Sequence, residues 1–243
     1  MKNKNIMVTG ASRGLGLEIT RRLASEGFNI FAVARKLTDE LNELIHHYDD
    51  GQITFHEFDL NNTDNISTFV SQVSRSNGPL WGLVNNAAVG HDGILPTQHD
   101  SAIEELIRVN VQAPILLAKY ASRSMLVGGG GRIINVSSII ASTGYKGLAV
   151  YAATKSAMIG FSRSLARDLG GAKINVNALA PGYMETEMTQ GLDDAKLASV
   201  KRRSPLGSLA TTSQVAGSVA FLLSDDATAI TGTVLTVDAG STA

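Results

Sequence analysis

Three polar residues in the second half of the chain have the types and spacing needed to move a proton to or from a carbonyl oxygen. Tyr151 and Lys155 are four residues apart, so on a helix both side chains lie on one face, and Ser138 comes thirteen residues before the tyrosine. A positive charge beside a phenol favours the phenolate, so the pair predicts that Lys155 lowers the pKa of Tyr151 from its ordinary value of about 10. Tyr151 then exchanges a proton near neutral pH, while the Ser138 hydroxyl can donate a hydrogen bond to the carbonyl oxygen.

The same spacing also has a purely structural interpretation. An exposed lysine four residues after a tyrosine can pack its aliphatic stem on the ring. A serine at the end of a strand can satisfy the strand's terminal groups, which is the role expected for the neighbouring Ser137. Further motifs elsewhere in the chain are needed to distinguish the catalytic from the structural interpretation.

A glycine-rich turn near the start of the chain predicts a phosphate-binding site. The turn runs from Thr9 to Gly16, follows a short apolar run and opens a stretch with helical spacing of its apolar residues. At such a place the backbone NH groups and the helix dipole can hold a pyrophosphate. The glycine spacing is Gly-x-x-x-Gly-x-Gly, and an ordinary loop is the alternative. The residues predicted to contact a cofactor here are Gly10, Ser12, Arg13, Gly14, Leu15 and Gly16.

The segment from Gly10 to Gly14 also has the pattern Gly-x-Ser-x-Gly, which is the nucleophile elbow of α/β-hydrolases. Such an enzyme needs a histidine later in the chain. The last of the five histidines is His99, so none lies in the C-terminal half. The sequence therefore argues against a hydrolase.

Short β-rich runs alternate with helical stretches along the whole chain. With right-handed crossovers, this alternation predicts one α/β domain over residues 1–243, with a Rossmann-like, doubly wound parallel sheet of about seven strands and helices on both faces. Thr38 is expected to cap the second helix, and Gly128 to Gly131 to form a tight loop between a long helix and a strand. The expected strands are Ile6–Thr9, Phe28–Ala34, Ile53–Phe58, Leu80–Asn85, Arg132–Ser137, Ile174–Ala180 and Val234–Val237.

Composition excludes several classes of function. A net charge of −1 gives no electrostatic case for binding nucleic acid or an anionic membrane. The absence of cysteine excludes disulfides and thiol nucleophiles, and the adjacent His46 and His47 lack the spacing of a metal site, so no metal is expected. The apolar run that ends at Gly10 is too short for a signal peptide or a membrane span, which predicts a cytoplasmic protein.

Taken in order along the chain, these motifs resemble those of the short-chain dehydrogenase/reductase family. Within that family the chain is most similar to 3-oxoacyl-(acyl-carrier-protein) reductases, in the segments Val150 to Ala157, Asn175 to Gly182 and Ile230 to Gly232. The motifs that carry the family resemblance are Thr9 to Gly16, Asp59-Leu60, Asn85 to Ala88, Asn110, Ser138, Tyr151 with Lys155, and Pro181-Gly182. The resemblance covers essentially the whole chain.

The resemblance implies roles for residues beyond the glycine turn. The catalytic set would be Asn110, Ser138, Tyr151 and Lys155, with Lys155 also holding the ribose of a nicotinamide. Asp59 would accept from the adenine amino group, or else cap the following loop, and Thr186 would contact the nicotinamide carboxamide, or else be a generic loop residue. The cofactor set beyond the glycine turn comprises Arg35, Asp59, Leu60, Asn86, Ala87, Tyr151, Lys155, Pro181, Gly182 and Thr186.

Asn110 has a physical argument of its own. Pro114 follows it by four residues, and a proline has no NH to donate to the carbonyl four residues before it. The Asn110 carbonyl could then hold a water that relays protons to Lys155. A polar residue on a kinked helix is the alternative.

The second expected strand indicates which dinucleotide is used. It ends at Ala34 and is followed by Arg35, where an NAD-specific enzyme would carry an acidic residue for the ribose hydroxyls. Arg35 and Arg13 are both expected near the adenosine 2′-phosphate, and guanidinium groups bind phosphate well. The sequence therefore predicts NADP(H), with two solvated loop arginines as the alternative.

The substrate side is less clearly defined. Residues 183–205 are expected to form a lid, in which Met184 and Met188 would line an acyl pocket and the basic triplet Lys201 to Arg203 would meet an acidic partner or simply be solvated. Relatives that act on acyl carrier protein commonly have arginines before the fifth and sixth strands, where this chain has Gly128 to Gly131 and Ala172-Lys173. The basic patch that docks the carrier in those relatives therefore has fewer positive charges in this chain.

The function expected from the sequence is NADPH-dependent reduction of a 3-oxoacyl thioester, bound to acyl carrier protein or to CoA, in fatty-acid or polyketide-type biosynthesis. Action on another ketone or secondary alcohol is the alternative. The resemblance also implies a homotetramer in which the helix of Tyr151 packs on its counterpart through Ala157, Phe161 and Leu165. The same three residues would equally suit an intramolecular core.

Overall fold

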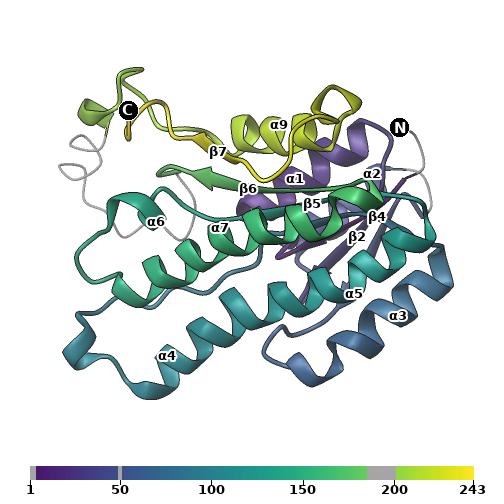
Figure 1. The fold of residues 1–243 in the computed structure, drawn as a ribbon, viewed down its shortest axis with the longest axis horizontal. Helices are drawn as coiled ribbons and strands as arrows, with labels where there is room; N and C mark the ends of the chain where they lie inside the picture. Colours follow the sequence, from purple (N-terminus) through teal and green to yellow (C-terminus); the bar gives the residue numbers. More distant parts are fainter. Residues whose placement is uncertain (1–3, 49–50, 185–200) are drawn as a thin grey trace.

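A computed structural model describes residues 4–48, 51–184 and 201–243 of the chain. Seven parallel strands form one sheet in the order β3-β2-β1-β4-β5-β6-β7 (Figure 1). The strands are β1 (Asn5–Thr9), β2 (Asn29–Ala34), β3 (Ile53–Glu57), β4 (Leu80–Asn85), β5 (Gly131–Val136), β6 (Ile174–Pro181) and β7 (Val234–Val237). Each strand bound lies within one residue of its predicted position, which confirms the predicted fold class.

Helices cover both faces of the sheet, as the alternating pattern predicts (Figure 1). On one face, α1 (Gly14–Ser25), α2 (Asp39–His47) and α9 (Thr212–Leu223) enclose a core that includes Leu23, Leu41 and Val219. On the other face, α3 (Ile66–Asn77), α5 (Ala113–Val127) and α7 (Ala149–Leu169) enclose a second core with Val70 and Leu117. Because both faces are buried, the central strands are continuous apolar runs.

Shorter helices connect these elements. The α-helices are α4 (Asp100–Ile107) and α6 (Ile140–Thr143), and the 3₁₀-helices are η1 (Thr63–Asn65), η2 (Leu95–Thr97), η4 (Gly170–Ala172) and η6 (Asp225–Ala227). The Thr38 hydroxyl accepts from the Leu41 NH at 3.3 Å, so the predicted helix cap is confirmed. Among the described residues, no helix is long and apolar enough to span a membrane.

The helical stretch that carries Asn110 and Pro114 contains a π-helical turn, which was not predicted. The chain passes from α4 to α5 through a π-helical turn, η3 (Arg108–Gln112), in which the Ala113 NH donates to the Arg108 carbonyl. Pro114 has no NH for the Asn110 carbonyl, and a wider turn is one way in which a helix accommodates that loss. Single π-helical turns inside helices often mark functional sites.

The carboxyl ends of the strands meet along one edge of the sheet, because all neighbouring strands are parallel. The strand order reverses between β1 and β4, and in parallel α/β sheets a crevice that binds dinucleotides lies outside the carboxyl ends of the strands at such a switch point. Thr9, Ala34, Asn85 and Val136 are the last residues of four strands at this edge. The glycine turn, Arg35, Asn86, Ala87 and Ser138 follow these four strands in the chain.

Candidate active site

The turn after β1 is locked to the loop after β4 by the side chains of Thr9 and Asn86. The Thr9 hydroxyl accepts from the NH groups of Asn86 and Ala87 at 3.0 and 3.1 Å. In return, the Asn86 amide nitrogen donates to the Thr9 carbonyl at 2.9 Å. Thr9 was not predicted as a site residue in its own right, although it stands in the predicted turn. It sets the spacing of the two loops that flank the crevice.

Two glycines in the turn are required by close approach of the backbone. A Cβ at Gly10, where φ is +67°, would lie 2.9 Å from the Ala87 Cα, and a Cβ at Gly16 would lie 2.0 Å from the Gly10 carbonyl oxygen. Gly14, with φ of +55°, faces open space. The turn is therefore a backbone cradle at the start of α1, which fits a pyrophosphate.

Two arginines lie beside this cradle, and both are exposed. Arg13 directly precedes α1, and Arg35 directly follows β2. The Thr38 hydroxyl donates to the Ser12 carbonyl at 2.6 Å, so the loop after β2 adjoins the glycine turn. Both arginines therefore lie on loops next to the cradle.

The loop after β3 holds the predicted adenine contacts. Leu60 is buried, and the exposed Asp59 carboxylate accepts from the Asn61 NH at 2.9 Å. This bond is the loop-capping role that was the alternative for Asp59. The adenine contact stays a prediction.

Glu105 on α4 joins the loops after β3 and β4. Its carboxylate lies 2.8 Å from His91 Nε2 and accepts from the Asn61 side chain at 3.4 Å. The hydrogen bond with His91 holds the pKa of Glu105 below its ordinary value. This cross-link was not predicted, because neither His91 nor Glu105 stands in a recognisable motif.

Tyr151 and Lys155 lie one turn apart on α7, as predicted, near the end of β5. The Lys155 ammonium is buried, donates to the Val136 carbonyl at 3.0 Å and lies 5.5 Å from the centre of the Tyr151 ring. The Ser137 hydroxyl donates to the Lys155 carbonyl at 2.7 Å, so this serine has a structural role, although it bonds the helix of Lys155 and not the end of its own strand. The lysine is therefore fixed at the strand end.

The predicted lowering of the Tyr151 pKa is wrong for this structure. Burial raises the pKa of Tyr151 to about 12, because a phenolate is poorly solvated there. Burial also lowers the pKa of Lys155 to about 8, for the same reason applied to a cation. The helical spacing identified the pair correctly, but the sign of the tyrosine shift follows from enclosure.

Asn110 connects Tyr151 to the loop after β4. Its side-chain amide accepts from the Val89 NH and donates to the Val89 carbonyl, both at 2.9 Å, and also donates to the Thr154 hydroxyl at 3.3 Å. The Thr154 hydroxyl donates to the Tyr151 carbonyl at 2.7 Å. Thr154 was missed from the sequence, since a threonine inside a helix carries no signal of its own.

Ser138 follows β5 by two residues and is partly buried. Its hydroxyl oxygen accepts from the Ile140 NH at 3.3 Å, which fixes the oxygen and leaves the hydroxyl hydrogen available for donation. Because Lys155 is bonded to Val136, the structure brings Ser138, Lys155 and Tyr151 to the same strand end. Such a set can orient a carbonyl oxygen and exchange a proton with it.

The loop after β6 closes the edge beside this set. The Pro181 carbonyl accepts from the Ile139 NH at 3.0 Å, and a Cβ at Gly182 would lie 2.6 Å from the Asp238 Cβ. Thr186 and residues 185–200 of the predicted lid lie outside the described residues.

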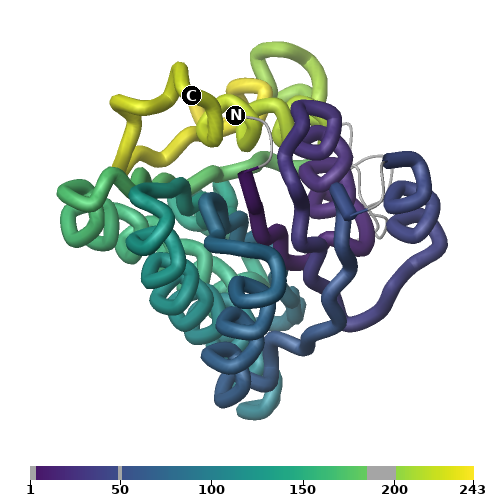
Figure 2. The backbone as a smooth tube through the Cα atoms, turned by 90° about the vertical axis from the view of Figure 1, so that its right-hand side faces the viewer, coloured from purple at the N-terminus to yellow at the C-terminus, as the bar shows by residue number. Residues whose placement is uncertain are grey.

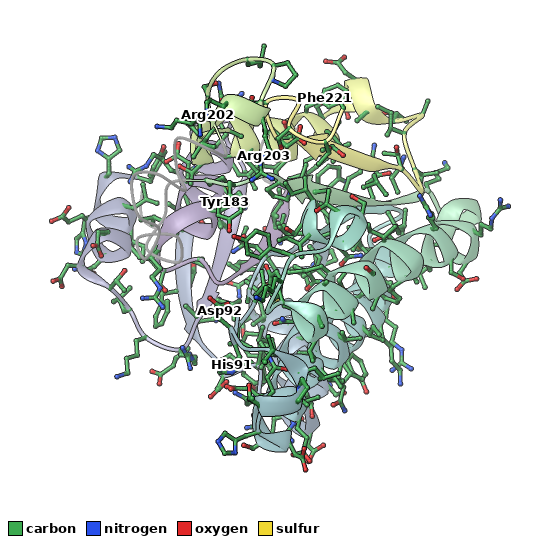
Figure 3. All side chains as sticks on the ribbon, turned by 90° about the vertical axis from the view of Figure 1, so that its left-hand side faces the viewer. His91, Asp92, Tyr183, Arg202, Arg203 and Phe221 are labelled. Carbon is green, nitrogen blue, oxygen red and sulfur yellow. The ribbon has the colours of Figure 1, made fainter. Side chains whose placement is uncertain are left out.

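In Figure 3, Tyr183 lies between Arg203 and Asp92. Burial raises the pKa of its phenol, with further contributions from a hydrogen bond with Tyr145 and from the charge of Asp92, while Arg203 acts in the opposite direction. Neither tyrosine was predicted as a site residue, because neither stands in a recognisable motif.

Comparison with known protein families shows a match over nearly the whole chain. The sequence model of the family described as enoyl-(acyl carrier protein) reductase matches residues 10–242. The chain is 35% identical to the 3-oxoacyl-[acyl-carrier-protein] reductase FabG of Haemophilus influenzae, over 99% of this chain and 98% of that protein. It is also 35% identical to the reductase MabA of Mycobacterium tuberculosis, over 98% of this chain and 92% of that protein.

Solved structures agree with the fold. A short-chain dehydrogenase/reductase from Serratia marcescens superposes with a TM-score of 0.92 at 31% identity, covering 100% of this chain and 99% of that one. A blue fluorescent protein from a metagenomic library, in complex with NADPH, superposes with a TM-score of 0.92 at 33% identity, with the same coverage. A putative NAD(P)-dependent gluconate 5-dehydrogenase from Beutenbergia cavernae, with bound NADP, gives 0.93 at 32% identity over 99% and 97% of the two chains.

Proposed function

Because this chain belongs to the short-chain dehydrogenase/reductase family of oxidoreductases, we propose that it reduces a 3-oxoacyl thioester to the 3-hydroxyacyl thioester with NADPH. Relatives that share 35% of the sequence over nearly the whole chain bear the name 3-oxoacyl-[acyl-carrier-protein] reductase. The observation that carries the proposal is the enclosed pair of Tyr151 and Lys155, fixed beside Ser138 at the carboxyl end of β5. The substrate would be carried by CoA or by an acyl carrier protein in fatty-acid or polyketide-type biosynthesis.

The crevice fits a dinucleotide. The backbone cradle between Gly10 and Gly16 would hold the pyrophosphate, since any Cβ at these two positions would clash. The exposed Arg13 and Arg35 would bind the 2′-phosphate, which favours NADPH over NADH. When bound, NADPH supplies the hydride. The other residues proposed to line its site are Asp59, Leu60, Asn86, Ala87, Lys155, Pro181, Gly182 and Thr186.

The chain's own residues would supply the proton. Tyr151 carries its proton at neutral pH, because its pKa is raised to about 12, so it is poised to donate to the carbonyl oxygen in the direction of reduction. Ser138 would orient that oxygen through its hydroxyl hydrogen. The Lys155 ammonium, with a pKa of about 8, stays mostly charged at pH 7 and would stabilise the phenolate that forms as Tyr151 gives up its proton.

Asn110 and Thr154 would act as positioning residues. Both are bonded along the path from Val89 to the Tyr151 carbonyl, so they hold the tyrosine against the loop that lines the crevice. Asn110 would in addition offer its backbone carbonyl to a water that returns protons to Lys155, since Pro114 has no NH for it.

A second candidate is reduction of another ketone, or oxidation of a secondary alcohol. The sequence identity of 32% to a protein described as a putative gluconate 5-dehydrogenase supports this second candidate. The same proton-donating residues can serve any carbonyl compound that the substrate site admits.

A substrate panel distinguishes the two. The purified protein would be assayed with NADPH against acetoacetyl-CoA, acetoacetyl-acyl carrier protein and a set of free ketones and sugar ketones, with Tyr151→Phe as the inactive control. We expect kcat/KM for the two thioesters to exceed that for every free ketone. A free ketone that is preferred over both thioesters overturns the proposal. The ratio between the two thioesters identifies the carrier.

We also propose a homotetramer. Phe161 and Leu165 on α7 pack partly on the core and remain half-buried in the single chain, as an interface helix would. Light scattering gives the assembly mass, and a monomer in solution contradicts this proposal without affecting the reaction.

A further inference from the structure

A second hollow lies at the amino ends of the strands, on the edge opposite the Tyr151 site. It has a volume of about 710 Å³ and is open to solvent. It lies between the glycine loop before β5, the start of β6 and the segment after α9. Figure 2 shows the backbone from the side of the molecule on which the amino ends of the strands lie. Its charged and aromatic lining residues are Lys4, Trp81, Arg132, Lys173 and Asp225.

Arg132 is a buried wall residue of this hollow, and hydrogen bonds hold its side chain in place. It is only 8% exposed, and its Nη1 donates at 3.0 Å to the Gly131 carbonyl and at 3.0 Å to the Asn175 side-chain oxygen. Asn175 is itself oriented, since its amide nitrogen donates to the carbonyls of Thr228 and Ile230. The buried Arg132 Nε has no hydrogen-bond partner. A buried, unpaired donor on a guanidinium is costly, so this side chain lacks one acceptor.

Trp81 brings a second cation beside the first. The Lys4 ammonium lies 4.0 Å from the centre of the Trp81 ring, and the Arg132 guanidinium carbon lies 5.5 Å from it. The indole also stacks on Phe28 inside the core. The ring thus holds two positive groups at the wall of the hollow, which cation–π attraction permits at a modest gain.

The charges in the lining do not balance. Among the described residues that line the hollow, there are three cations, Lys4, Arg132 and Lys173, and one carboxylate, Asp225. Asp225 acts on Arg132 through its charge, but burial has the larger effect and lowers the pKa of the guanidinium. An anion in the hollow would offset the excess positive charge of its lining.

We propose that this hollow is a binding site for a phosphate-type oxyanion, held by Arg132, Lys4 and Lys173. A tetrahedral oxyanion offers several acceptor oxygens, which suits one fixed guanidinium and two ammonium groups on flexible stems. The hollow is larger than one phosphate ion, so a phosphate ester of a small metabolite fits as well as free phosphate. The hollow is separate from the Tyr151 set, because the strands run the length of the sheet between the two edges, and it lies at the loops where carrier-using relatives commonly have arginines.

Trp81 makes the site directly observable, since it is the only tryptophan in the chain. Its emission would be titrated with inorganic phosphate in the full-length protein without added dinucleotide, against sodium chloride at equal ionic strength. We expect a saturable change with phosphate and only a small, unsaturable change with chloride. Equal responses to the two salts overturn the proposal.

Variants locate the binding. Lys173→Asn removes an exposed ammonium while keeping a residue that tolerates the φ of +60° at this position, and Lys4→Gln removes the second ammonium at the rim. Each should weaken phosphate binding at least about threefold, and the two together at least about tenfold. Arg132→Gln should abolish the response, but its fold needs checking by circular dichroism because the residue is buried.

Arg75→Gln is the matched control, because it removes an exposed cation from a different hollow beside α3 and should leave the phosphate titration unchanged. A saturable phosphate response that survives the Lys4 and Lys173 changes intact would place the anion elsewhere and refute the site. Comparing inorganic phosphate with glycerol 3-phosphate shows which kind of ligand the hollow prefers. Tighter binding of the ester indicates a phosphorylated metabolite, and equal binding of the two indicates free phosphate.

Discussion

The two halves of the carboxyl edge hold their functional groups in opposite ways. Around β1 to β3 the groups are backbone NH donors and two exposed arginines, Arg13 and Arg35, and close packing of glycine sets the geometry. Around β4 to β6 the groups are enclosed side chains, and Lys155 is 4% exposed. The first half can bind a ligand by shape and charge. The second half alters the pKa of both Tyr151 and Lys155 by burying them.

The difference in burial between the two halves corresponds to a difference in role, ligand binding in the first half and proton transfer in the second. A group used only to bind works best when it stays charged in water, since no desolvation has to be offset before the ligand arrives. A group used for proton transfer has to respond to small changes around it, and burial makes it responsive. Changes in the two halves should therefore give different kinds of effect, and four variants test this.

The largest effect is expected from Tyr151→Phe. The ring remains and fills the same space, but the proton donor is lost, so turnover should fall about 10²-fold or more. The affinity for NADPH, measured by titration of its fluorescence, should stay within about twofold, since the change is confined to the chemical half. Retention of most of the activity would remove Tyr151 from the proposed mechanism.

Gly16→Ala should affect the binding half instead. A Cβ there would lie 2.0 Å from the Gly10 carbonyl oxygen, so the turn has to shift, at a cost of about 1–3 kcal/mol in stability, and NADPH binding should weaken about tenfold or more. Gly14→Ala is the matched control in the same turn. It meets no atom within 4 Å and carries only the strain of its φ of +55°, about 1–2 kcal/mol, so NADPH affinity should change less. Equal losses of affinity in both variants would mean that the cradle does not depend on close packing.

Lys155 should make the stability of the protein depend on pH. Its pKa is about 8 in the folded chain and 10.5 ordinarily, so between these values the unfolded chain holds a proton that the folded chain has released. The free energy of unfolding therefore rises with pH across this window. From pH 8 to about 9.5 the rise amounts to about 2 kcal/mol.

Lys155→Met isolates that contribution. Denaturant unfolding at pH 7 and at about pH 9.5 should show the wild type gaining stability over the variant by about 2 kcal/mol as the pH rises. Above pH 10 the raised pKa of Tyr151 has the opposite effect, because the folded tyrosine then keeps a proton that the unfolded one loses. A difference that is constant between the two pH values would show that the folded Lys155 has an ordinary pKa.

The binding half was predictable from the sequence, because it depends on local spacing. A glycine turn between a strand and a helix has one common geometry, and the strand bounds follow from continuous apolar runs that parallel sheets bury on both faces. Residues such as Gly10, Gly16 and Arg35 therefore lie where their positions in the chain predict. Thr9 was missed as an individual residue only because its contacts come from the loop after β4, far along the chain.

The chemical half was predictable in its residues but not in its energetics. The spacing of Tyr151 and Lys155 identifies a shared helix face, yet the direction of a pKa shift depends on what surrounds the pair in space. The sequence shows that Pro114 follows Asn110 by four residues, but it does not show that the helix forms a π-helical turn there. Arg132 is a similar case, since a charged residue opening an apolar strand reveals neither its burial nor its unpaired Nε.

The smallest effect is expected from the exposed arginines of the binding half. Arg35→Asp combined with Arg13→Ala removes two guanidinium groups and places a carboxylate where it would repel a 2′-phosphate and accept from ribose hydroxyls. The ratio of kcat/KM for NADPH to that for NADH should fall about tenfold or more, which corresponds to about 1.4 kcal/mol. Lys36→Asp is the control for charge alone, because it makes the same change as Arg35→Asp at the next exposed position. If Lys36→Asp shifts the ratio as far as Arg35→Asp does, the preference reflects the general field at this end of the crevice. A wild-type protein that uses both dinucleotides equally well would contradict the assignment of NADPH before any variant is made.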